Sequence, residues 1–197
     1  MSTSAERKPA TYEDLLAVPG DLVAEILDGE LFTSPRPAFP HAHASTTLGG
    51  DISTRFHHPR GGGDNPGGWW IIFEPELHFK NDVVVPDIAG WRRERVPLLP
   101  NAPWSEIAPD WICEVVSART EAIDRGRKLN IYAREGVNHL WLVNPLARTL
   151  EVYRLSESGW TLLRTLVNDE VVQAEPFASA AIDMSRWWLP EAPPELR

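Results

Sequence analysis

Residues 109–145 read PDWICEVVSARTEAIDRGRKLNIYAREGVNHLWLVNP. The segment 110–117 is a compact apolar run of strand length with one acid inside it, and 138–145 is a second buried run. Between them, residues 120–136 predict a helix, with Gly136 suited to its C-terminal end. The alternating stretches TLEVYRLS and GWTLLRTLV, which come next, predict two further strands. This order predicts an α/β fold (an α+β mixed sheet) with a helix packed across the sheet.

Shorter elements are predicted before this segment. Thr11 is a candidate helix N-cap, and Asp14 stands at the capping-box position, where Glu or Gln is more usual. The stretch LVAEILDGELF, residues 22–32, predicts two strands around a turn at Asp28-Gly29. Residues 41–58 predict a helix that Gly49 and Gly50 weaken.

The sharpest alternation of apolar and polar residues is WWIIFEPELHFK, residues 69–80. It predicts one strand with an apolar face and a polar face, and Glu76 falls on the polar face. After Asn81-Asp82, the run VVVPDIAGW predicts the second strand of a hairpin. Asp87 lies in the middle of this apolar run, directly after a proline.

Composition limits the classes of protein to consider. The 197 residues carry a formal net charge of -9, which counts against a non-specific DNA binder held by overall charge, although a local basic patch can still act. The single cysteine, Cys113, excludes an internal disulfide and fits a reducing cytoplasm. No run approaches the roughly 18 apolar residues of a membrane span. We therefore expect a cytoplasmic protein.

We also expect a flexible N-terminus over residues 1–10 and a single domain over residues 11–197, because no repeat divides the chain. Trp187 and Trp188 lie in a proline-rich tail. They predict either packing into a second subunit, and hence a homodimer, or a tail that folds back on its own core.

Asp87 and Glu114 are the first candidates for chemistry, because each is a lone acid in an apolar strand. A buried carboxylate is costly without a partner, and two on neighbouring strands raise each other's pKa. A hard cation such as Mg²⁺ resolves this by accepting oxygen ligands. The alternative is that each acid meets an arginine or lies at an exposed strand end.

The predicted helix adds three further candidates. Asp124, Lys128 and Tyr132 are spaced four residues apart and therefore share one face. From the border of the buried side, Lys128 could reach the sheet edge where Glu114 lies, and there stabilise charge or position an attacking water. The alternative is a surface ion pair between Asp124 and Lys128, worth a few tenths of a kcal/mol.

Glu76 is a third candidate metal ligand, although alternation explains it equally well as a solvent-facing residue. His41 and His43 have no acidic partner nearby in the sequence, and a zinc site needs a tighter cluster of ligands. Basic residues flank the proposed acids in two groups, which suits a phosphate-bearing substrate. We expect Arg92, Arg93 and Arg125 from these groups to bind substrate.

Taken together, LVAEILDGELF, the histidine-containing helix start, VPDIAGW and the 109–145 segment resemble the Uma-two family of restriction endonucleases, a branch of the PD-(D/E)XK nucleases. The most specific part is an acid-bearing strand followed by a D-x-x-x-K-x-x-x-Y helix, Gly-Val and an apolar strand that ends in Asn-Pro. The resemblance covers roughly residues 11–180. It implies a restriction-endonuclease-like fold, with a central mixed sheet flanked by helices.

The resemblance also implies phosphodiester cleavage dependent on Mg²⁺ or Mn²⁺. Asp87 and Glu114 match the two acids of the family, and Glu76 matches an additional acid found in many members. The superfamily lysine belongs two residues after the second acid, where this chain has Val116. The lysine that the following helix supplies corresponds to Lys128, with Tyr132 as its support.

Two other functions stay open at this point. One is a catalytically inactive nuclease-like scaffold that binds nucleic acid or a protein partner, which the acidic charge and Val116 favour. The other is a hydrolase of small phosphorylated molecules, although no nucleoside-binding motif is visible. For the nuclease, DNA is the expected substrate, without a sequence signal that excludes RNA.

Overall fold

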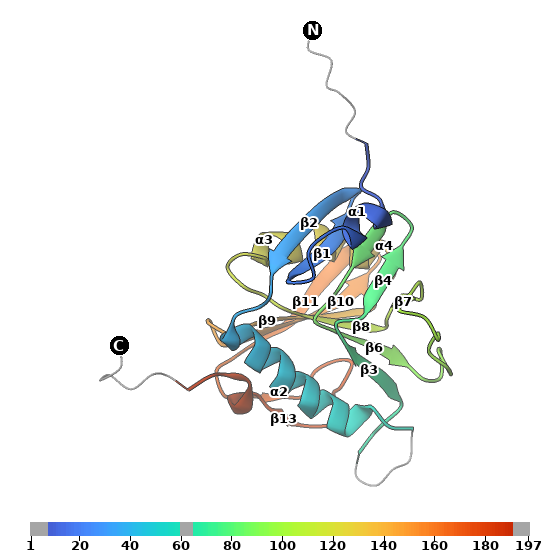
Figure 1. Cartoon of the computed structure of the whole chain (residues 1–197). Helices are drawn as coiled ribbons and strands as arrows, with labels where there is room; N and C mark the ends of the chain where they lie inside the picture. The colour runs from blue at the N-terminus through green and yellow to red at the C-terminus, as the bar shows by residue number, and fades with distance from the viewer. Residues whose placement is uncertain (1–7, 60–64, 191–197) are drawn as a thin grey trace, which may run out of the picture.

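Two β-sheets dominate the computed structural model, which describes residues 8–59 and 65–190 (Figure 1). One sheet has six strands in the order β11-β10-β9-β8-β6-β3, the other has five in the order β2-β1-β5-β4-β7, and β12 pairs with β13. The strands are β1 (Leu22–Leu27), β2 (Glu30–Pro35), β3 (Trp69–Phe73), β4 (Glu76–Phe79), β5 (Asp82–Val84), β6 (Ile88–Arg92), β7 (Trp104–Ser105), β8 (Trp111–Val115), β9 (His139–Asn144), β10 (Thr149–Ser156), β11 (Gly159–Val167), β12 (Val171–Val172) and β13 (Ile182–Asp183). The helices are α1 (Tyr12–Leu16), α2 (Phe39–Phe56), α3 (Glu121–Ile123), the π-helical turn η1 (Asp124–Lys128), α4 (Leu129–Arg134) and the 3₁₀ helix η2 (Met184–Trp187). Residues 1–7 of the expected N-terminal segment lie outside the described residues.

The 109–145 segment forms the centre of the six-stranded sheet. β8 and β9 pair in parallel, and the helical segment from α3 to α4 connects them. The other neighbouring strands of this sheet pair antiparallel. The predicted mixed sheet with helices packed against it is therefore confirmed. β8 is buried along its whole length because both of its faces are covered, which explains its nearly continuous apolar sequence.

One hydrophobic core lies between α2 and the six-stranded sheet (Figure 1). The buried apolar side chains of α2 recur at every fourth position and form one stripe: Ala44, Leu48, Ile52 and Phe56. Trp187 and Trp188 from the tail belong to the same core. These two tryptophans therefore fold back on their own chain and give no support to a homodimer.

A second core lies on the opposite face of this sheet, under the five-stranded sheet and α4. It contains residues from both sheets and from the helix: Leu27, Leu77, Ile112, Ile131 and Leu140. Side chains of β8 and of Val116, which follows it, alternate between the two cores, with Cys113 in the first core and Ile112 and Val116 in the second. By this alternation Glu114 faces the side of the second core.

The prediction of a single strand over residues 69–80 is wrong. β3 pairs with β6 in the six-stranded sheet, whereas β4 pairs with β5 in the five-stranded sheet. Between them Glu74 has a φ of 44°, which residues other than glycine rarely adopt, and Pro75 has no N–H for a strand ladder. At Glu74 and Pro75 the chain crosses from one sheet to the other. The alternation of apolar and polar residues continues through this break, so the sequence pattern does not reveal it.

The prediction that Asp87 lies within a strand is also wrong. β5 ends at Val84 and β6 begins at Ile88, in the other sheet, so Asp87 stands in the crossing between them. Pro86 disfavours a continuous ladder because it lacks an N–H and restricts the backbone of Val85. The N–H of Val85 instead donates to the Glu25 side chain at 2.8 Å.

The helix predicted over residues 120–136 is present from Glu121 to Arg134, but its middle is a π-helical turn. Gly136 has a φ of 76° and follows the end of α4, as predicted. A π-helical turn widens the helix and is frequent at functional sites. Here it contains both Asp124 and Lys128.

The remaining local predictions agree with the structure. The Thr11 side chain caps α1, and Asp14 completes the capping box. β1 and β2 form the hairpin expected around Asp28-Gly29. The helix expected over residues 41–58 is α2, which begins two residues earlier and ends at Phe56.

Candidate active site

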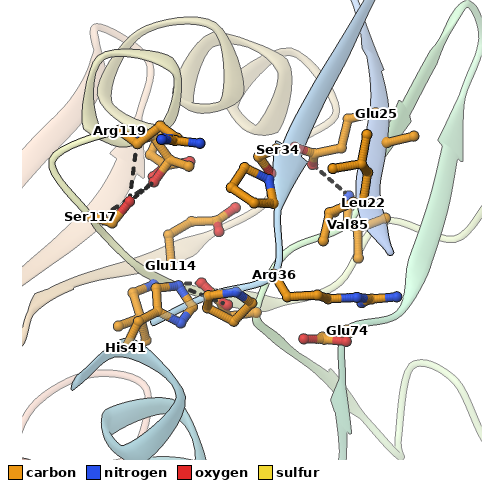
Figure 2. Close-up of a pocket in the computed structure, with 18 of the residues that line it drawn as sticks. Leu22, Glu25, Ser34, Arg36, His41, Glu74, Val85, Glu114, Ser117 and Arg119 are labelled. Atoms are coloured by element: carbon orange, nitrogen blue, oxygen red, sulfur yellow. Dashed lines mark hydrogen bonds and ion pairs between the residues drawn. The ribbon is translucent and has the colours of Figure 1, made fainter. Parts of the chain in front are cut away.

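A cavity of about 780 Å³ opens where β8 ends and β6 begins (Figure 2). Its walls come from the β1–β2 hairpin, the start of α2, the turn after β8 and the π-helical turn. Its charged and titratable lining residues are Glu25, Arg36, His41, Glu74, Glu76, Asp87, Glu114, Arg119, Asp124 and Lys128. The predicted acids and the predicted lysine thus line one cavity.

Lys128 stands at the centre of an acidic cluster. Its Nζ lies 2.8 Å from Glu114 Oε1 and 3.1 Å from Glu25 Oε1. It also lies 3.9 Å from Asp124 Oδ1, and it donates a hydrogen bond to the Val85 carbonyl at 3.3 Å. Only 3% of the lysine is exposed, so the alternative of a surface Asp124–Lys128 pair does not apply.

The charges of this cluster do not balance, because one lysine meets three carboxylates. Burial raises the pKa of Glu114 well above its usual value, although Lys128 acts against this. Burial likewise raises the pKa of Asp124. For Lys128, burial lowers the pKa, but the charges of Glu114 and Glu25 outweigh it and the pKa lies well above its usual value. Lys128 is therefore a protonated donor at neutral pH.

Tyr132 supports Glu114 from the first turn of α4. Its hydroxyl is fully buried and donates a hydrogen bond to Glu114 Oε1. Burial, with the nearby charge of Glu114, raises the pKa of Tyr132 well above its usual value, so the hydroxyl keeps its proton. The face predicted to carry Asp124, Lys128 and Tyr132 is therefore the face that points to the acid of β8.

Asp87 is held by two contacts from elsewhere in the chain. The backbone N–H of Val115 donates to its Oδ2 at 2.7 Å, and His41 Nε2 lies 3.2 Å from its Oδ1. Burial lowers the pKa of His41, but the hydrogen bond and charge of Asp87 outweigh burial and raise it overall. The second ring nitrogen of His41, Nδ1, is buried and has no hydrogen-bond partner among the described residues.

Sequence reasoning missed Glu25 and the role of His41. Glu25 is a lone acid in the apolar strand LVAEIL, which is the same signal that identified Asp87 and Glu114. That signal could have found it. The partner of His41 lies 46 positions further along the chain, so no local pattern indicates their contact.

Glu76 and Glu74 both line the cavity, but they differ in their surroundings. Glu76 Oε1 accepts a hydrogen bond from Tyr12 at 2.8 Å and lies 2.7 Å from His78 Nε2. Glu74 makes no side-chain hydrogen bond or ion pair with the residues that the structure describes, and Figure 2 shows it at the cavity beside Arg36. Of the two acids, Glu74 has the unengaged carboxylate.

The sequence matches the Uma2 family, described as "Putative restriction endonuclease", over residues 9–185. The chain belongs to the Uma2 family. Its structure is similar to the crystal structure of "a putative nuclease belonging to DUF820" from Anabaena variabilis ATCC 29413, with a TM-score of 0.70 and 23% sequence identity. That similarity covers 91% of this chain and 97% of the other chain. No curated protein matches the sequence.

The Uma2 assignment confirms the restriction-endonuclease-like fold and the nuclease class. Within the described ranges, no helix is both long enough and apolar enough to cross a membrane.

The three arginines expected to bind substrate in this Uma2 protein do not line the cavity. Arg92 and Arg93 lie over the rings of Trp69 and Trp70, at 4.6 and 3.2 Å from the ring centroids. Arg125 makes a bidentate pair with Glu151, in which both bonds are 2.7 Å. All three are therefore engaged in internal contacts.

The donor set fits a hard divalent cation. Over residues 8–59 and 65–190, no three His, Cys, Asp or Glu side chains form a cluster able to hold a metal alone. Mg²⁺ needs no such cage, because it usually takes one or two protein carboxylates and fills its other positions with water and substrate phosphate. Asp87 and Glu114 can supply two carboxylates at the cavity. Their oxygen ligands suit Mg²⁺ or Mn²⁺ and do not select zinc.

Proposed function

We propose that this protein is a metal-dependent endonuclease that hydrolyses phosphodiester bonds in DNA. The observation that carries the proposal is that Asp87, Glu114 and Lys128 come from separate elements yet line one cavity. The nuclease class of the family supports the reaction type.

Asp87 and Glu114 would hold Mg²⁺ or Mn²⁺. When bound, the cation supplies a Lewis acid that neutralises the phosphate and lowers the pKa of a water molecule. The surrounding acids Glu25 and Asp124 make the cavity more negative, which favours a divalent cation there.

Lys128 would act as a hydrogen-bond donor and a positive charge rather than as a general base. Its three carboxylate neighbours keep it protonated, and Glu25 and Glu114 hold its Nζ in place. A preorganised cation of this kind stabilises the negative charge that develops on the phosphate in the transition state. Tyr132 fixes the Glu114 carboxylate by its hydrogen bond.

Val116, which occupies the strand position of the usual lysine, does not argue against catalysis. Its side chain is buried in the second core, and Lys128 from the next element is 2.8 Å from Glu114. A lysine from a different position in the chain therefore answers one of the two reasons for an inactive scaffold; the other is the acidic net charge.

The test is a cleavage assay on labelled DNA with Mg²⁺ or Mn²⁺, with the wild-type protein beside Asp87→Asn. We expect the wild type to cleave and the variant to lose cleavage, because asparagine removes the ligand charge while it preserves side-chain size. Glu157→Gln, in the exposed turn between β10 and β11, is the matched control and should cleave normally. Calorimetry with Mg²⁺ tests the inactive scaffold, since a site that binds no cation at millimolar concentration contradicts a metal nuclease.

A further inference from the structure

The depth of the cavity restricts what kind of DNA can reach the reactive groups. Glu114 and Lys128 are only 2% and 3% exposed, so neither group lies on an open surface. The volume of about 780 Å³ falls in the range of sites that enclose a small ligand, about 300–1,000 Å³. A cavity of this size can enclose single nucleotides but not a turn of duplex.

The positive charge at the cavity is also small. Arg36 and Arg119 are the exposed cations in its lining, and Figure 2 shows them on opposite sides of Glu114. Arg119 makes no hydrogen bond or ion pair with another described residue, and Arg36 donates to the Gly20 carbonyl at 3.1 Å. Strongly salt-dependent binding to duplex DNA comes from many phosphate contacts, on the order of 6–10. Two arginines suit one phosphate on each side of the reacting one.

Exposed apolar side chains also line the cavity. Leu16 and Leu146 line it and are 64% and 73% exposed. Five prolines share this lining: Pro19, Pro35, Pro37, Pro40 and Pro145. Apolar side chains of this kind pack against the faces of bases only when the bases are unstacked. In a duplex those faces are not accessible.

We propose that the cavity takes an unpaired DNA strand, with the reacting phosphate at Asp87 and Glu114, flanking phosphates on Arg36 and Arg119, and unstacked bases against Leu16 and Leu146. This inference rests on the proposed function and specifies its substrate as single-stranded or locally unpaired DNA. We expect intact duplex to be excluded, because it is too wide to enter the cavity and bring a phosphate to the buried Glu114 and Lys128.

The experiment compares one labelled oligonucleotide in three forms: single strand, full duplex, and duplex with a central mismatched bubble. Binding to the wild-type protein is measured by fluorescence anisotropy with Ca²⁺, and cleavage is measured with Mg²⁺ and Mn²⁺. We expect single strand and bubble to bind about tenfold or more tightly than duplex, because duplex must first unstack a base. Cleavage of the bubble should fall within its unpaired part.

Variants of the lining separate the two kinds of contact. Arg36→Ala and Arg119→Ala should each lower the slope of log affinity against log salt by about 0.7, the value for one phosphate of a single strand. Leu16→Ser with Leu146→Ser should weaken binding and leave this slope unchanged. Arg164→Ala, an exposed arginine of β11 outside the cavity, is the matched control and should change neither.

The outcomes distinguish this inference from the proposed function. Equal or tighter binding of intact duplex, or unchanged salt slopes in both arginine variants, overturns the inference even if DNA is cleaved. Selective binding of the single strand without cleavage of any form supports the inference and overturns the nuclease. Absence of binding to all three forms overturns both.

Discussion

Replacing Lys128 with methionine should destabilise the fold strongly, and more strongly than replacing the acid that it contacts. Methionine fills a similar volume but leaves Glu114, Glu25 and Asp124 together without a cation. Breaking a buried ion pair from one side costs about 3–5 kcal/mol, because the remaining charge stays buried and uncompensated. Glu114→Gln should cost less, since Lys128 keeps two carboxylates and the amide oxygen can still accept from Tyr132.

Urea denaturation measures this difference. With a slope of about 2 kcal/mol per molar urea, a loss of 3–5 kcal/mol lowers the midpoint by about 1.5–2.5 M. We expect Glu114→Gln to lose only about 1.5–3 kcal/mol, the range for one hydrogen bond to a charged group. Lys8→Met, at an exposed position, is the control and should stay within about 0.5 kcal/mol of the wild type.

Two results would contradict this role of Lys128. A loss below about 1 kcal/mol in Lys128→Met would mean that the lysine does not compensate a buried acidic cluster. An equal loss in Lys128→Met and Glu114→Gln would mean that Glu25 and Asp124 do not hold the lysine when Glu114 is neutral. The expected loss also means that activity of Lys128→Met must be measured at a temperature where the variant is shown to be folded.

Three further substitutions test contacts of Asp87, His41 and Gly90. Asp87→Asn should change the melting temperature little while it abolishes cleavage, because asparagine can still accept the Val115 N–H. Folding raises the pKa of His41, so the ion pair of protonated His41 with Asp87 stabilises the fold fully below the ordinary histidine pKa of about 6.5. This stabilisation is lost as the pH rises through the raised pKa. The difference in unfolding free energy between wild type and His41→Gln, measured by denaturation at a series of pH values, should therefore shrink over that window. Gly90→Ala should cost about 1–3 kcal/mol in the same assay, because an added Cβ would lie 3.1 Å from the buried Trp111 ring; a variant as stable as wild type would show that the ring can move.

The pattern of apolar and polar residues predicted the strands and the helix of the 109–145 segment. It also predicted which face of the helix carries Asp124, Lys128 and Tyr132. The spacing of Asp124, Lys128 and Tyr132 was sufficient, because three residues four apart share a helix face whatever surrounds it. The acids Asp87 and Glu114 were identifiable because a lone carboxylate in an apolar run needs a partner. These properties depend on neighbours along the chain, which the sequence contains.

The same kind of sequence pattern gave a wrong prediction where the chain crosses from one sheet to the other. Alternation over residues 69–80 continues through Glu74 and Pro75, so periodicity could not distinguish one strand from two. The arginines near the acids looked available for substrate, yet Arg93 lies over Trp70 and Arg125 pairs with Glu151. Charge near a site in the sequence does not determine what that charge contacts.

Sequence was therefore sufficient to predict the central strand–helix–strand unit, the nuclease resemblance and five of the residues that line the cavity: Glu76, Asp87, Glu114, Asp124 and Lys128. Only the tertiary structure decided that His41 holds Asp87, that Glu25 shares Lys128 with Glu114, and which cations remain free to meet a substrate. The physical reason is that secondary structure follows from periodicity between near neighbours, whereas the burial and pairing of a charge depend on residues that folding brings together from distant parts of the chain.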